Sequence, residues 1–391
     1  MMFRLACLFL AGLPAVFAAE KSLRALADEQ FAFAARQYAG LLARMEGNRT
    51  DEPRTWIDGR LVTVPPRDWV SGFFPGSLWL IYEHIRDPKF RAAAEEFTNR
   101  LESLKDFTGT HDLGFMLGCS YGEGYRLRPT AAYREVLIQG ARSLATRFDP
   151  KSGTIRSWDS DHWKHPVIVD NMMNLELLLF AARESGDDSL RRIAISHADR
   201  TLANHFRPDG SSYHLLDYDP ATGAVVRRQT VQGFADDSAW ARGQAWGLYG
   251  FTRMHALTGD RAYLEQACRI ADFIAGHPHL PADGIPYWDF NVPHLPDALR
   301  DASAGAVMAS ALLELAPLAG GGRGARYQAL AERQLRTLCT AAFRAGPDEN
   351  GGFLLMHSVG HLPQRSEVDV PLAYADYYFL QALARASAGA R

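Results

Sequence analysis

The sequence predicts an all-α fold in which helical hairpins close into an (α/α)6 barrel, and three observations support this prediction. First, about twelve segments carry apolar residues at i, i+3 and i+4 spacing, which is the period of an amphipathic helix. Second, short breaker signals join many of these segments in pairs. Third, longer irregular segments separate the pairs, so a ring of hairpins would have short turns at one end and long loops at the other.

The helical segments account for most of the chain. They are expected near residues 21–47, 70–86, 88–105, 113–126, 130–148, 170–185, 187–207, 237–258, 260–276, 298–318, 324–344 and 371–388. The junctions Asp87-Pro88, Gly186-Asp187-Asp188 and Gly259-Asp260 each end one helix and cap the next. Segments that are apolar nearly all round are expected in the inner ring, namely 70–86, 170–185, 237–258 and 298–318. Segments with charge on one face suit the outer ring, namely 88–105, 187–207 and 260–276.

Five longer connections are rich in glycine, proline, aspartate, tryptophan and histidine. They span residues 49–69, 149–169, 208–236, 277–297 and 345–370. Long connections in a compact domain are usually functional. The chemistry is therefore expected at the end of the ring that carries them.

The first residues have the pattern of an export signal. Residues Met1–Arg4 carry one positive charge, Leu5–Phe17 are almost wholly apolar, and Ala18 precedes the expected cleavage point. The apolar run is too short to span a bilayer core of ~30 Å as a stable helix. The sequence therefore predicts a signal peptide over residues 1–18 and one catalytic barrel domain over residues 19–391. The protein is expected to be secreted and periplasmic, with no membrane attachment after the signal is removed.

Composition argues against several classes of partner and cofactor. The chain has 42 Lys and Arg against 45 Asp and Glu, a net charge of −3, and neither a basic tract nor an acidic tail. Nothing therefore indicates nucleic-acid binding, which relies on clustered positive charge. After the signal, Cys119, Cys268 and Cys339 make neither a disulfide framework nor a metal-ligand spacing, and are expected to be small buried packing residues. HExxH, CxxC and GxSxG are absent, so no metal and no cofactor are expected.

Four stretches are richer in polar and aromatic residues than packing requires. Asp68–Gly76 leads into an apolar segment, and its glycines let the backbone approach a neighbour closely. Within His111–Phe115, Asp112 is either a site residue or the N-cap of the next helix. Within Pro166–Leu175, Asp170 lies between two apolar runs, where a low dielectric raises the pKa of a carboxylate toward that of a general acid. Helix capping is the alternative role for Asp170.

The fourth stretch, Gln232–Trp246, contains the expected start of an apolar helix and a positively charged arginine within that helix. Asp237 or Ser238 is suited to cap that helix. Arg242 and Trp246 lie four residues apart and so share one helical face. An arginine on an inward face requires a partner, which is either a bound carboxylate or a protein acid in a structural ion pair.

Together these stretches resemble the unsaturated glucuronyl hydrolases, glycoside hydrolase family 88. The resemblance runs from about residue 25 to the C-terminus and rests on motifs in the family's order. The motifs are DWVSGFFPG, HDLGF with YGEGYRL downstream, VIVDNMMNLELL, DDSAWARGQAWGLYGF and EVDVPLAYADYYFLQAL. The family fold is an (α/α)6 barrel, which agrees with the helix count.

The resemblance implies hydration of a double bond in place of ordinary glycoside hydrolysis. Polysaccharide lyases leave a C4=C5 double bond on the non-reducing uronic acid, which makes that sugar an enol ether. An acid protonates C4, positive charge develops at C5 and the ring oxygen, and water adds at C5. The hemiketal then opens and rearranges, which releases the neighbouring sugar and a 5-keto uronic acid. The substrates implied are unsaturated glycosaminoglycan di- or oligosaccharides, with a chondroitin or hyaluronan disaccharide as the first choice.

The resemblance also assigns roles to eleven residues. Asp170 is the main acid/base and Asp112 holds the sugar hydroxyls, and their like charge would help keep one of them protonated. Trp69 and Trp246 stack on the sugar rings, which have an apolar C–H face. The other residues implied are His111, His214, Gln232 and Arg242 around the glycone or the attacking water, and Ser358, His361 and Tyr374 near the second sugar and its sulfate.

Three alternatives stay open at the level of the sequence. An unsaturated rhamnogalacturonyl hydrolase would share the barrel and the chemistry but take pectin fragments, although Arg242 within ARGQAW favours the glucuronyl family. A non-catalytic sugar-binding barrel is disfavoured because both Asp112 and Asp170 are present. A structural toroid for protein partners leaves the aromatic loops unexplained. The chain is expected to be a monomer or a weak homodimer.

Overall fold

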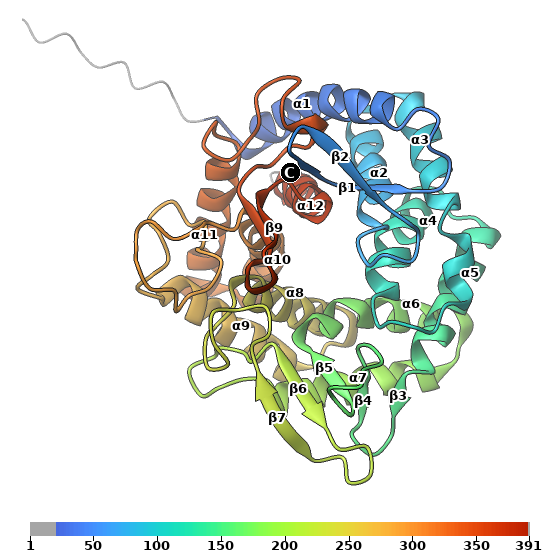
Figure 1. The fold of residues 1–391 in the computed structure, drawn as a ribbon, viewed down its shortest axis with the longest axis vertical. Coiled ribbons are helices and arrows are strands. Elements are labelled where there is room, and N and C mark those ends of the chain that lie inside the picture. Colours follow the sequence, from blue (N-terminus) through green and yellow to red (C-terminus); the bar gives the residue numbers. More distant parts are fainter. Residues whose placement is uncertain (1–20, 390–391) are drawn as a thin grey trace, which may run out of the picture.

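The computed structural model describes residues 21–389, and these residues form a closed double ring of helices (Figure 1). The helices are α1 (Leu23–Arg44), α2 (Phe73–Ile85), α3 (Pro88–Asn99), α4 (Glu123–Leu127), α5 (Ala131–Ala145), α6 (Leu175–Ser185), α7 (Asp188–Asn204), α8 (Ala241–Thr258), α9 (Arg261–Gly276), α10 (Ala302–Ala319), α11 (Gly321–Leu338) and α12 (Ala373–Gly389). The predicted all-α (α/α)6 fold is therefore confirmed. The predicted signal segment, residues 1–18, lies outside the described residues.

Packing contacts separate an inner ring from an outer ring. The inner ring runs from α2 through the π-helix η2 (Gly114–Gly122) to α6, α8, α10 and α12, and α12 packs back on α2. The outer helices are α1, α3, α5, α7, α9 and α11. The all-round apolar pattern thus identified inner helices correctly. Helix α10 shows why, because it is long and apolar enough to cross a membrane, yet 72% of that stretch is buried within the ring.

The short junctions between paired helices have the caps that the sequence predicts. Asp87, Asp187 and Asp260 each accept a hydrogen bond from a backbone N–H in the first turn of α3, α7 and α9. Gly186 and Gly259 end α6 and α8 in the left-handed region, with φ of 76° and 75°. These junctions satisfy the free backbone groups at the helix ends and fix where each inner helix stops.

Two inner segments are not α-helical where the sequence predicts an α-helix. The segment after Asp112 is the π-helix η2, and residues Val169–Asn174 form the 3-10 helix η3 directly before α6. Glycines at 114, 118 and 122 lower the α-helical propensity of η2. Wider and tighter turns of this kind are often found at functional sites.

Helix α8 begins later than predicted. Its first residue is Ala241, and no side chain caps it. The hydroxyl of Ser238 donates instead to Asp289 at 2.6 Å, and Asp237 is exposed. The cap predicted at Asp237 or Ser238 is therefore wrong, because the Ser238 hydroxyl donates to a loop residue and not to the backbone of the helix.

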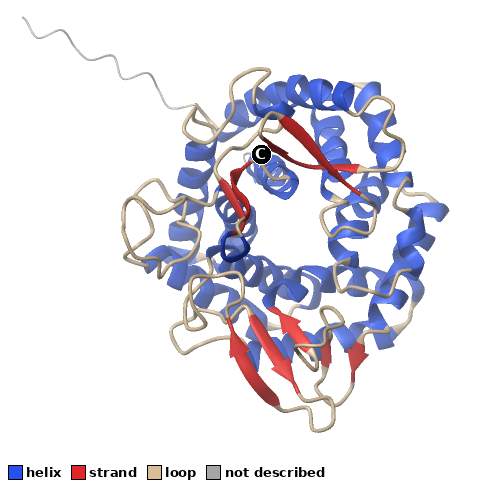
Figure 2. Ribbon diagram, in the orientation of Figure 1, coloured by secondary structure: helices blue, strands red, loops and turns tan. Residues whose placement is uncertain are grey.

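The long loops contain short antiparallel strands that helical periodicity did not predict (Figure 2). The pairs are β1 (Glu52–Ile57) with β2 (Arg60–Val64), β3 (Phe148–Asp149) with β4 (Thr154–Ile155), β5 (Pro166–Ile168) with β6 (Leu215–Tyr218) and then β7 (Val225–Gln229), and β8 (Ser358–His361) with β9 (Ser366–Val370). Strand β1 contacts α2, α12 and β9, so the first and last hairpins lie together at one end of the ring.

Candidate active site

Seven of the eleven residues named from the sequence lie near the beginnings of inner helices, and His214, Gln232, Ser358 and His361 lie in the long connections. Trp69 lies four residues ahead of α2, Asp112 two residues ahead of η2, and Asp170 lies in η3 before α6. Arg242 and Tyr374 occupy the second positions of α8 and α12. Closure of the ring, and not proximity in the sequence, assembles the site.

Aromatic rings form one wall of the site. The ring centroid of Trp69 lies 5.0 Å from that of Tyr374, and Trp246 lies 6.5 Å from Tyr374. Phe115 lies between the two tryptophans, 5.6 Å from Trp69 and 5.2 Å from Trp246. Trp246 and Tyr374 are buried, whereas Trp69 is partly exposed. Trp69 is therefore the ring with free surface for stacking, and the others support it.

Asp170 is a buried carboxyl group whose Oδ2 atom has no protein hydrogen-bond partner among the described residues. Burial raises the pKa of Asp170 to about 7, the positive charge of Arg242 opposes this shift, and the negative charge of Asp112 adds to it. Asp170 caps no helix, because the N-cap of η3 is Ile168. A carboxyl group with this pKa is partly protonated near neutral pH, as a general acid must be.

His214 lies beside Asp170, with 3.6 Å between its Nε2 atom and Oδ2 of the aspartate. Burial holds the pKa of His214 well below its usual range, so its ring is neutral. Trp240 packs edge-on against that ring at 4.8 Å. Neither ring nitrogen of His214 has a hydrogen-bond partner within residues 21–389. A neutral imidazole in this place offers one donor and one acceptor.

Asp112 is held by its own loop. Thr110 Oγ1 donates to its Oδ2 atom at 2.6 Å, and His111 Nε2 lies 3.2 Å from its Oδ1 atom. Burial lowers the pKa of His111, and the charge of Asp112 works against that shift. The N-cap interpretation of Asp112 is wrong, because the residue before η2 is Leu113 and no side chain caps that helix.

A close contact between η2 and η3 brings the two aspartates into one site. The N–H of Phe115 donates to Asn174 Oδ1 at 2.8 Å, and Asn174 Nδ2 donates to the carbonyl oxygen of Asp170 at 3.4 Å. Gly114 lies so near η3 that a Cβ atom there would sit 2.5 Å from the Cα of Asn174. Glycine is therefore required at position 114 for the two segments to meet.

Arg242 is held by the protein itself. Its Nη1 atom lies 3.1 Å from Asp301 Oδ2, and the guanidinium also donates to the carbonyl oxygens of Val359 and Gly360. Gln232 Oε1 accepts from Nη2 at 3.2 Å. A protein acid, Asp301, is thus one partner of this arginine, and its Nε atom has no hydrogen-bond partner among residues 21–389. Arg242 thereby joins α8 to α10 and to β8.

The β8–β9 hairpin brings Ser358 and His361 to the same end of the ring. Ser358 is fully buried, and its hydroxyl has no hydrogen-bond partner in the described part of the chain. His361 is half-buried, and burial lowers its pKa, with the charge of Arg242 acting in the same direction. The two residues flank the carbonyl groups that Arg242 binds.

Polar atoms without a protein partner are frequent in this set. Buried polar groups in folded proteins nearly always have a hydrogen-bond partner. Among residues 21–389, seven of the eleven carry a buried nitrogen or oxygen atom without one, namely His111, Asp170, His214, Arg242, Trp246, Ser358 and Tyr374. Donors and acceptors of this kind match the hydroxyl-rich edge of a sugar. The cluster can therefore bind a polyhydroxylated ligand beside a carboxyl group that is able to donate a proton.

Sequence reasoning missed three residues that support the site. Asp301 pairs with Arg242 and caps α10 through the N–H of Ser303, so an aspartate directly before an apolar helix was the available signal. Trp240 packs against His214, and Phe115 separates the two site tryptophans. Trp240 and Phe115 lie within the motifs that predicted the site, but no spacing rule distinguishes them from core residues.

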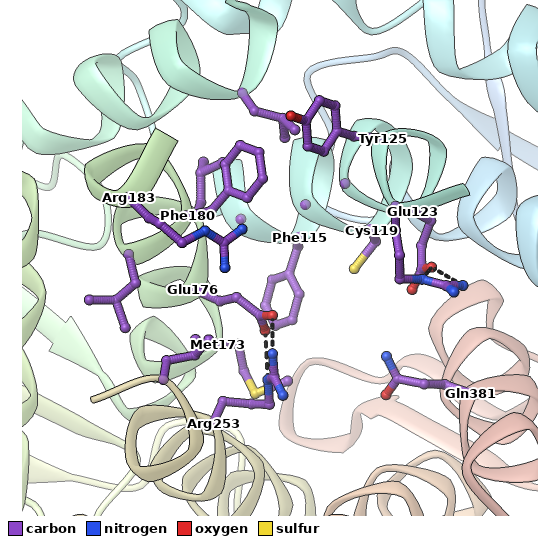
Figure 3. A pocket seen from close by; sticks show the side chains of 18 of the residues that line it. Phe115, Cys119, Glu123, Tyr125, Met173, Glu176, Phe180, Arg183, Arg253 and Gln381 are labelled. Carbon is purple, nitrogen blue, oxygen red and sulfur yellow. Dashed lines mark hydrogen bonds and ion pairs between the residues drawn. The ribbon is translucent and has the colours of Figure 1, made fainter. Parts of the chain in front are cut away.

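A separate cavity of about 1050 Å³ lies inside the ring, between residues of η2, α6, α8 and α12 (Figure 3). None of the eleven residues lines it. Some of its polar groups pair with each other, since Glu176 Oε1 lies 2.5 Å from Arg253 Nη2, and Tyr249 donates to Gln381 at 3.1 Å. Phe115 lines this cavity and also contacts Trp246, so it lies between the cavity and the site.

The cysteines and the metal-binding side chains give no second centre in the described part of the chain. Cys119 and Cys268 are buried thiols and Cys339 is half-buried, and none forms a disulfide bond. The first two are thus the packing residues that the sequence predicts. Within residues 21–389, no group of three or more His, Cys, Asp and Glu side chains gathers as a metal ion would require.

Comparison with known proteins gives consistent relatives, although no family model matches the chain. An unsaturated glucuronyl hydrolase from Formosa agariphila is 46% identical over 325 residues, which cover 82% of this chain and 80% of that protein. An unsaturated glucuronyl hydrolase from Bacillus sp. strain GL1 is 34% identical over 82% of this chain and 87% of its own. An unsaturated chondroitin disaccharide hydrolase from Streptococcus pyogenes is 32% identical over 84% of this chain and 83% of its own.

Solved structures give the same result. An unsaturated glucuronyl hydrolase specific for heparin superposes with a TM-score of 0.90 at 46% identity, covering 94% of this chain and 98% of the other. The unsaturated glucuronyl hydrolase of Streptococcus agalactiae superposes with a TM-score of 0.86 at 28% identity, covering 93% and 92%. A mutant of that enzyme in complex with dGlcA-GalNAc6S superposes with a TM-score of 0.78 at 26% identity, covering 94% and 93%.

Proposed function

This chain belongs to the unsaturated glucuronyl hydrolase family, and on that premise we propose that Asp170 starts the hydration of an unsaturated uronic acid in its site. The protein is a hydrolase that acts on glycosaminoglycan fragments made by lyases. One observation carries the proposal: Asp170 is a buried carboxyl with a pKa near 7 and a free Oδ2 atom, amid other buried polar atoms without protein partners.

The proton on Asp170 begins the reaction. The electron pair of the C4=C5 bond takes that proton at C4, which leaves positive charge shared by C5 and the ring oxygen. Water adds at C5 and returns a proton to the Asp170 carboxylate, so the acid is regenerated. The resulting hemiketal opens to a ketone at C5, and the hemiacetal left at C1 then expels the neighbouring sugar.

The other residues place the sugar for this transfer. Trp69 stacks on the unsaturated ring, and Asp112, held by Thr110, accepts hydrogen bonds from the sugar hydroxyls. His214 is neutral and 3.6 Å from Asp170, which suits an imidazole that orients the attacking water. Arg242 acts through its protein contacts, because its ion pair with Asp301 fixes Gln232 and the β8–β9 hairpin around the ligand.

Heparin-type fragments are the substrates that we favour. The chain is 46% identical to an enzyme specific for heparin and 32% identical to an unsaturated chondroitin disaccharide hydrolase. This difference favours heparin fragments over the chondroitin or hyaluronan disaccharide expected from the sequence. The names of these relatives also favour glycosaminoglycan fragments over the rhamnogalacturonan alternative.

The test compares unsaturated disaccharides from heparin, chondroitin, hyaluronan and rhamnogalacturonan by the loss of the ultraviolet absorbance of the enol ether. We expect the absorbance to decay for the glycosaminoglycan substrates, fastest for heparin, while a saturated disaccharide of the same linkage stays intact. Cleavage of the saturated sugar at a similar rate would mean ordinary glycoside hydrolysis. Decay with the rhamnogalacturonan fragment alone would move the substrate to pectin.

Export and assembly are further parts of the proposal. The pattern of residues 1–18 supports a cleaved signal and a periplasmic enzyme, where lyase products are at hand. The N-terminal sequence of the mature protein would test this, with Ala19 as the expected first residue. A monomer or weak homodimer is proposed as well, and light scattering over a concentration series would test it.

A further inference from the structure

The two hairpins at the site end of the ring are joined by one arginine. Arg54 in β1 makes a two-pronged ion pair with Glu367 in β9, with Nε to Oε1 at 2.6 Å and Nη2 to Oε2 at 2.7 Å. Its remaining nitrogen, Nη1, donates to Asp68 Oδ2 at 2.7 Å. Arg54 therefore uses all three guanidinium nitrogens on two acids from two different segments, a geometry that lysine cannot reproduce.

The first of these acids, Asp68, is adjacent in the chain to the stacking residue Trp69. Asp68 is the neighbour of Trp69, and its Oδ1 atom accepts the N–H of Val70 at 3.1 Å, so the turn that carries the tryptophan is tied at its base. The exposed fraction of the side chain is 20% for Arg54 and 23% for Asp68. Partial burial of this kind gives a charge-assisted hydrogen bond more weight than it has on an open surface.

The second acid leads to the β8–β9 hairpin. The Glu367 side chain is only 9% exposed, and its Cβ lies 2.7 Å from where a Cβ on Gly360 would be. Gly360 gives its carbonyl oxygen to Arg242 and is the neighbour of His361. Arg54 is thus linked through Glu367 to the hairpin segment that holds Arg242 and carries the predicted contacts to the second sugar.

The β8–β9 hairpin has a strained backbone, which neighbouring contacts must keep in place. Arg365, Glu367 and Asp369 have φ of 53°, 55° and 57°, in the left-handed region that non-glycine residues avoid. Each such residue costs of the order of 1 kcal/mol unless its surroundings impose the conformation. The ion pair from Arg54 to Glu367 is one such constraint, and strain of this kind is found where a segment must be held for function.

We propose that Arg54 is a positioning residue that sets the distance between Trp69 and the β8–β9 hairpin, and thereby fixes the width of the site for an unsaturated disaccharide. This inference rests on the proposed function for its substrate. It concerns binding of the sugar pair and not the proton transfer, since Arg54 touches neither aspartate of the acid/base pair.

The experiment compares Arg54→Met and Arg54→Lys with Arg323→Met on the unsaturated disaccharide that the wild type turns over best. Arg323 is a matched control because it also binds two acids, Asp272 and Glu265, but on the outer ring. We expect KM to rise about tenfold for Arg54→Met with kcat within about threefold, and a smaller rise for Arg54→Lys. Arg323→Met should leave both constants unchanged.

Two further measurements test the inference, and the first of them does not depend on turnover. Amide hydrogen exchange should increase in residues 67–72 and 358–370 for Arg54→Met and not for Arg323→Met. The double variant Arg54→Glu, Glu367→Arg restores opposite charges between β1 and β9 but sets a carboxylate against Asp68, so its KM should return only part of the way to the wild-type value. If the wild type turned over no disaccharide, the proposed function would be wrong. The hydrogen-exchange data would still test whether Arg54 holds the two segments. Wild-type KM together with wild-type exchange in Arg54→Met would overturn the inference, as would a loss confined to kcat.

Discussion

Asp170 and Asp112 carry the same carboxyl group in two different environments. Asp170 is buried with an Oδ2 atom free of protein partners, whereas Asp112 accepts a hydrogen bond from Thr110 at 2.6 Å. Burial favours the neutral acid at Asp170. The two environments fit the roles proposed above, with Asp170 as proton donor and Asp112 as a hydrogen-bond acceptor for the sugar.

The pH dependence of the rate follows from the raised pKa of Asp170. The reaction needs the protonated acid, so kcat/KM should be high below about pH 7 and fall about tenfold per pH unit above it. Initial rates of absorbance loss across a pH series would measure this. A rate constant that kept rising up to about pH 9 would contradict the assignment, because it would require a base in its charged form.

The same pKa predicts a stability change in Asp170→Asn. The folded-state pKa of about 7 lies above the ordinary value of 3.8, so the contribution of this group to stability is full below about pH 4 and is lost as pH rises toward 7. Asparagine cannot ionise, so the variant should be more stable than the wild type at pH 8, by roughly 4 kcal/mol at most. Denaturant unfolding at pH 4 and pH 8 would measure the difference, and equal gains at both pH values would contradict it.

At this scale the sequence named residues that the fold brings to one end of the ring, but it did not predict how they are held. The motif around Asp170 pointed to a buried acid, and the structure places it where the pKa is raised. The partner of Arg242 stayed open because Asp301 is 59 residues away, and only the packing of α8 against α10 brings the two together. A helix cap was the alternative role for Asp112 and the role expected of Asp237 or Ser238, because a short polar residue before a helix has the same local pattern whether it caps or binds a neighbour.

At the scale of elements, the π-helix η2 places two glycines in opposite situations. A Cβ on Gly118 would meet no atom within 4 Å, whereas one on Gly114 would lie 2.5 Å from the Cα of Asn174. Both glycines line the cavity inside the ring, but only Gly114 also forms the close contact between η2 and η3.

The matched pair Gly118→Ala and Gly114→Ala tests this difference. Gly118→Ala should stabilise the protein by about 0.5–1 kcal/mol with no change in activity, because alanine favours helical conformations and loses less entropy on folding. Gly114→Ala should destabilise the fold and lower kcat/KM, because η2 and η3 would have to move apart. Thermal unfolding and disaccharide turnover of the two variants give the comparison. An active, stable Gly114→Ala protein would contradict the proposed role of this contact.

Helices were predictable at this scale and strands were not. Apolar spacing identifies segments such as α9 and α10 because each runs for several turns and repeats its pattern. The strands are two to six residues long, so alternation has too few positions to stand out. The π-helix was also hidden, because its apolar pattern over nine residues resembles that of an α-helix.

For the whole molecule, the ring is closed by contacts between its first and last helices. Asp376 in α12 is fully buried and accepts hydrogen bonds from Tyr38 in α1 at 3.2 Å and from the N–H groups of Leu354 and Leu355 at 2.9 and 3.0 Å. One carboxyl group therefore joins both ends of the chain to the segment that leads into β8. Closure and the position of the site hairpin depend on the same residue.

Replacement of that residue tests closure. Asp376→Ala leaves two backbone N–H groups and a tyrosine hydroxyl buried without partners, so it should lower the free energy of unfolding by about 3 kcal/mol or more. Asp28→Ala is the matched control, because Asp28 also joins the first pair of helices, through His84 at 2.8 Å, but on an exposed surface. That variant should change stability little. Equal losses in the two variants, measured by denaturant unfolding, would contradict a special role for Asp376.

The central claim for the whole molecule is that the barrel adds water across an enol ether with Asp170 as the acid. The most direct measurement follows the ultraviolet absorbance of an unsaturated heparin or chondroitin disaccharide with the wild type and with folded Asp170→Asn, under identical conditions. We predict rapid decay with the wild type and a rate lower by about 10²–10⁴-fold with Asp170→Asn, because asparagine has no proton to give. Decay at the wild-type rate with Asp170→Asn would contradict the account.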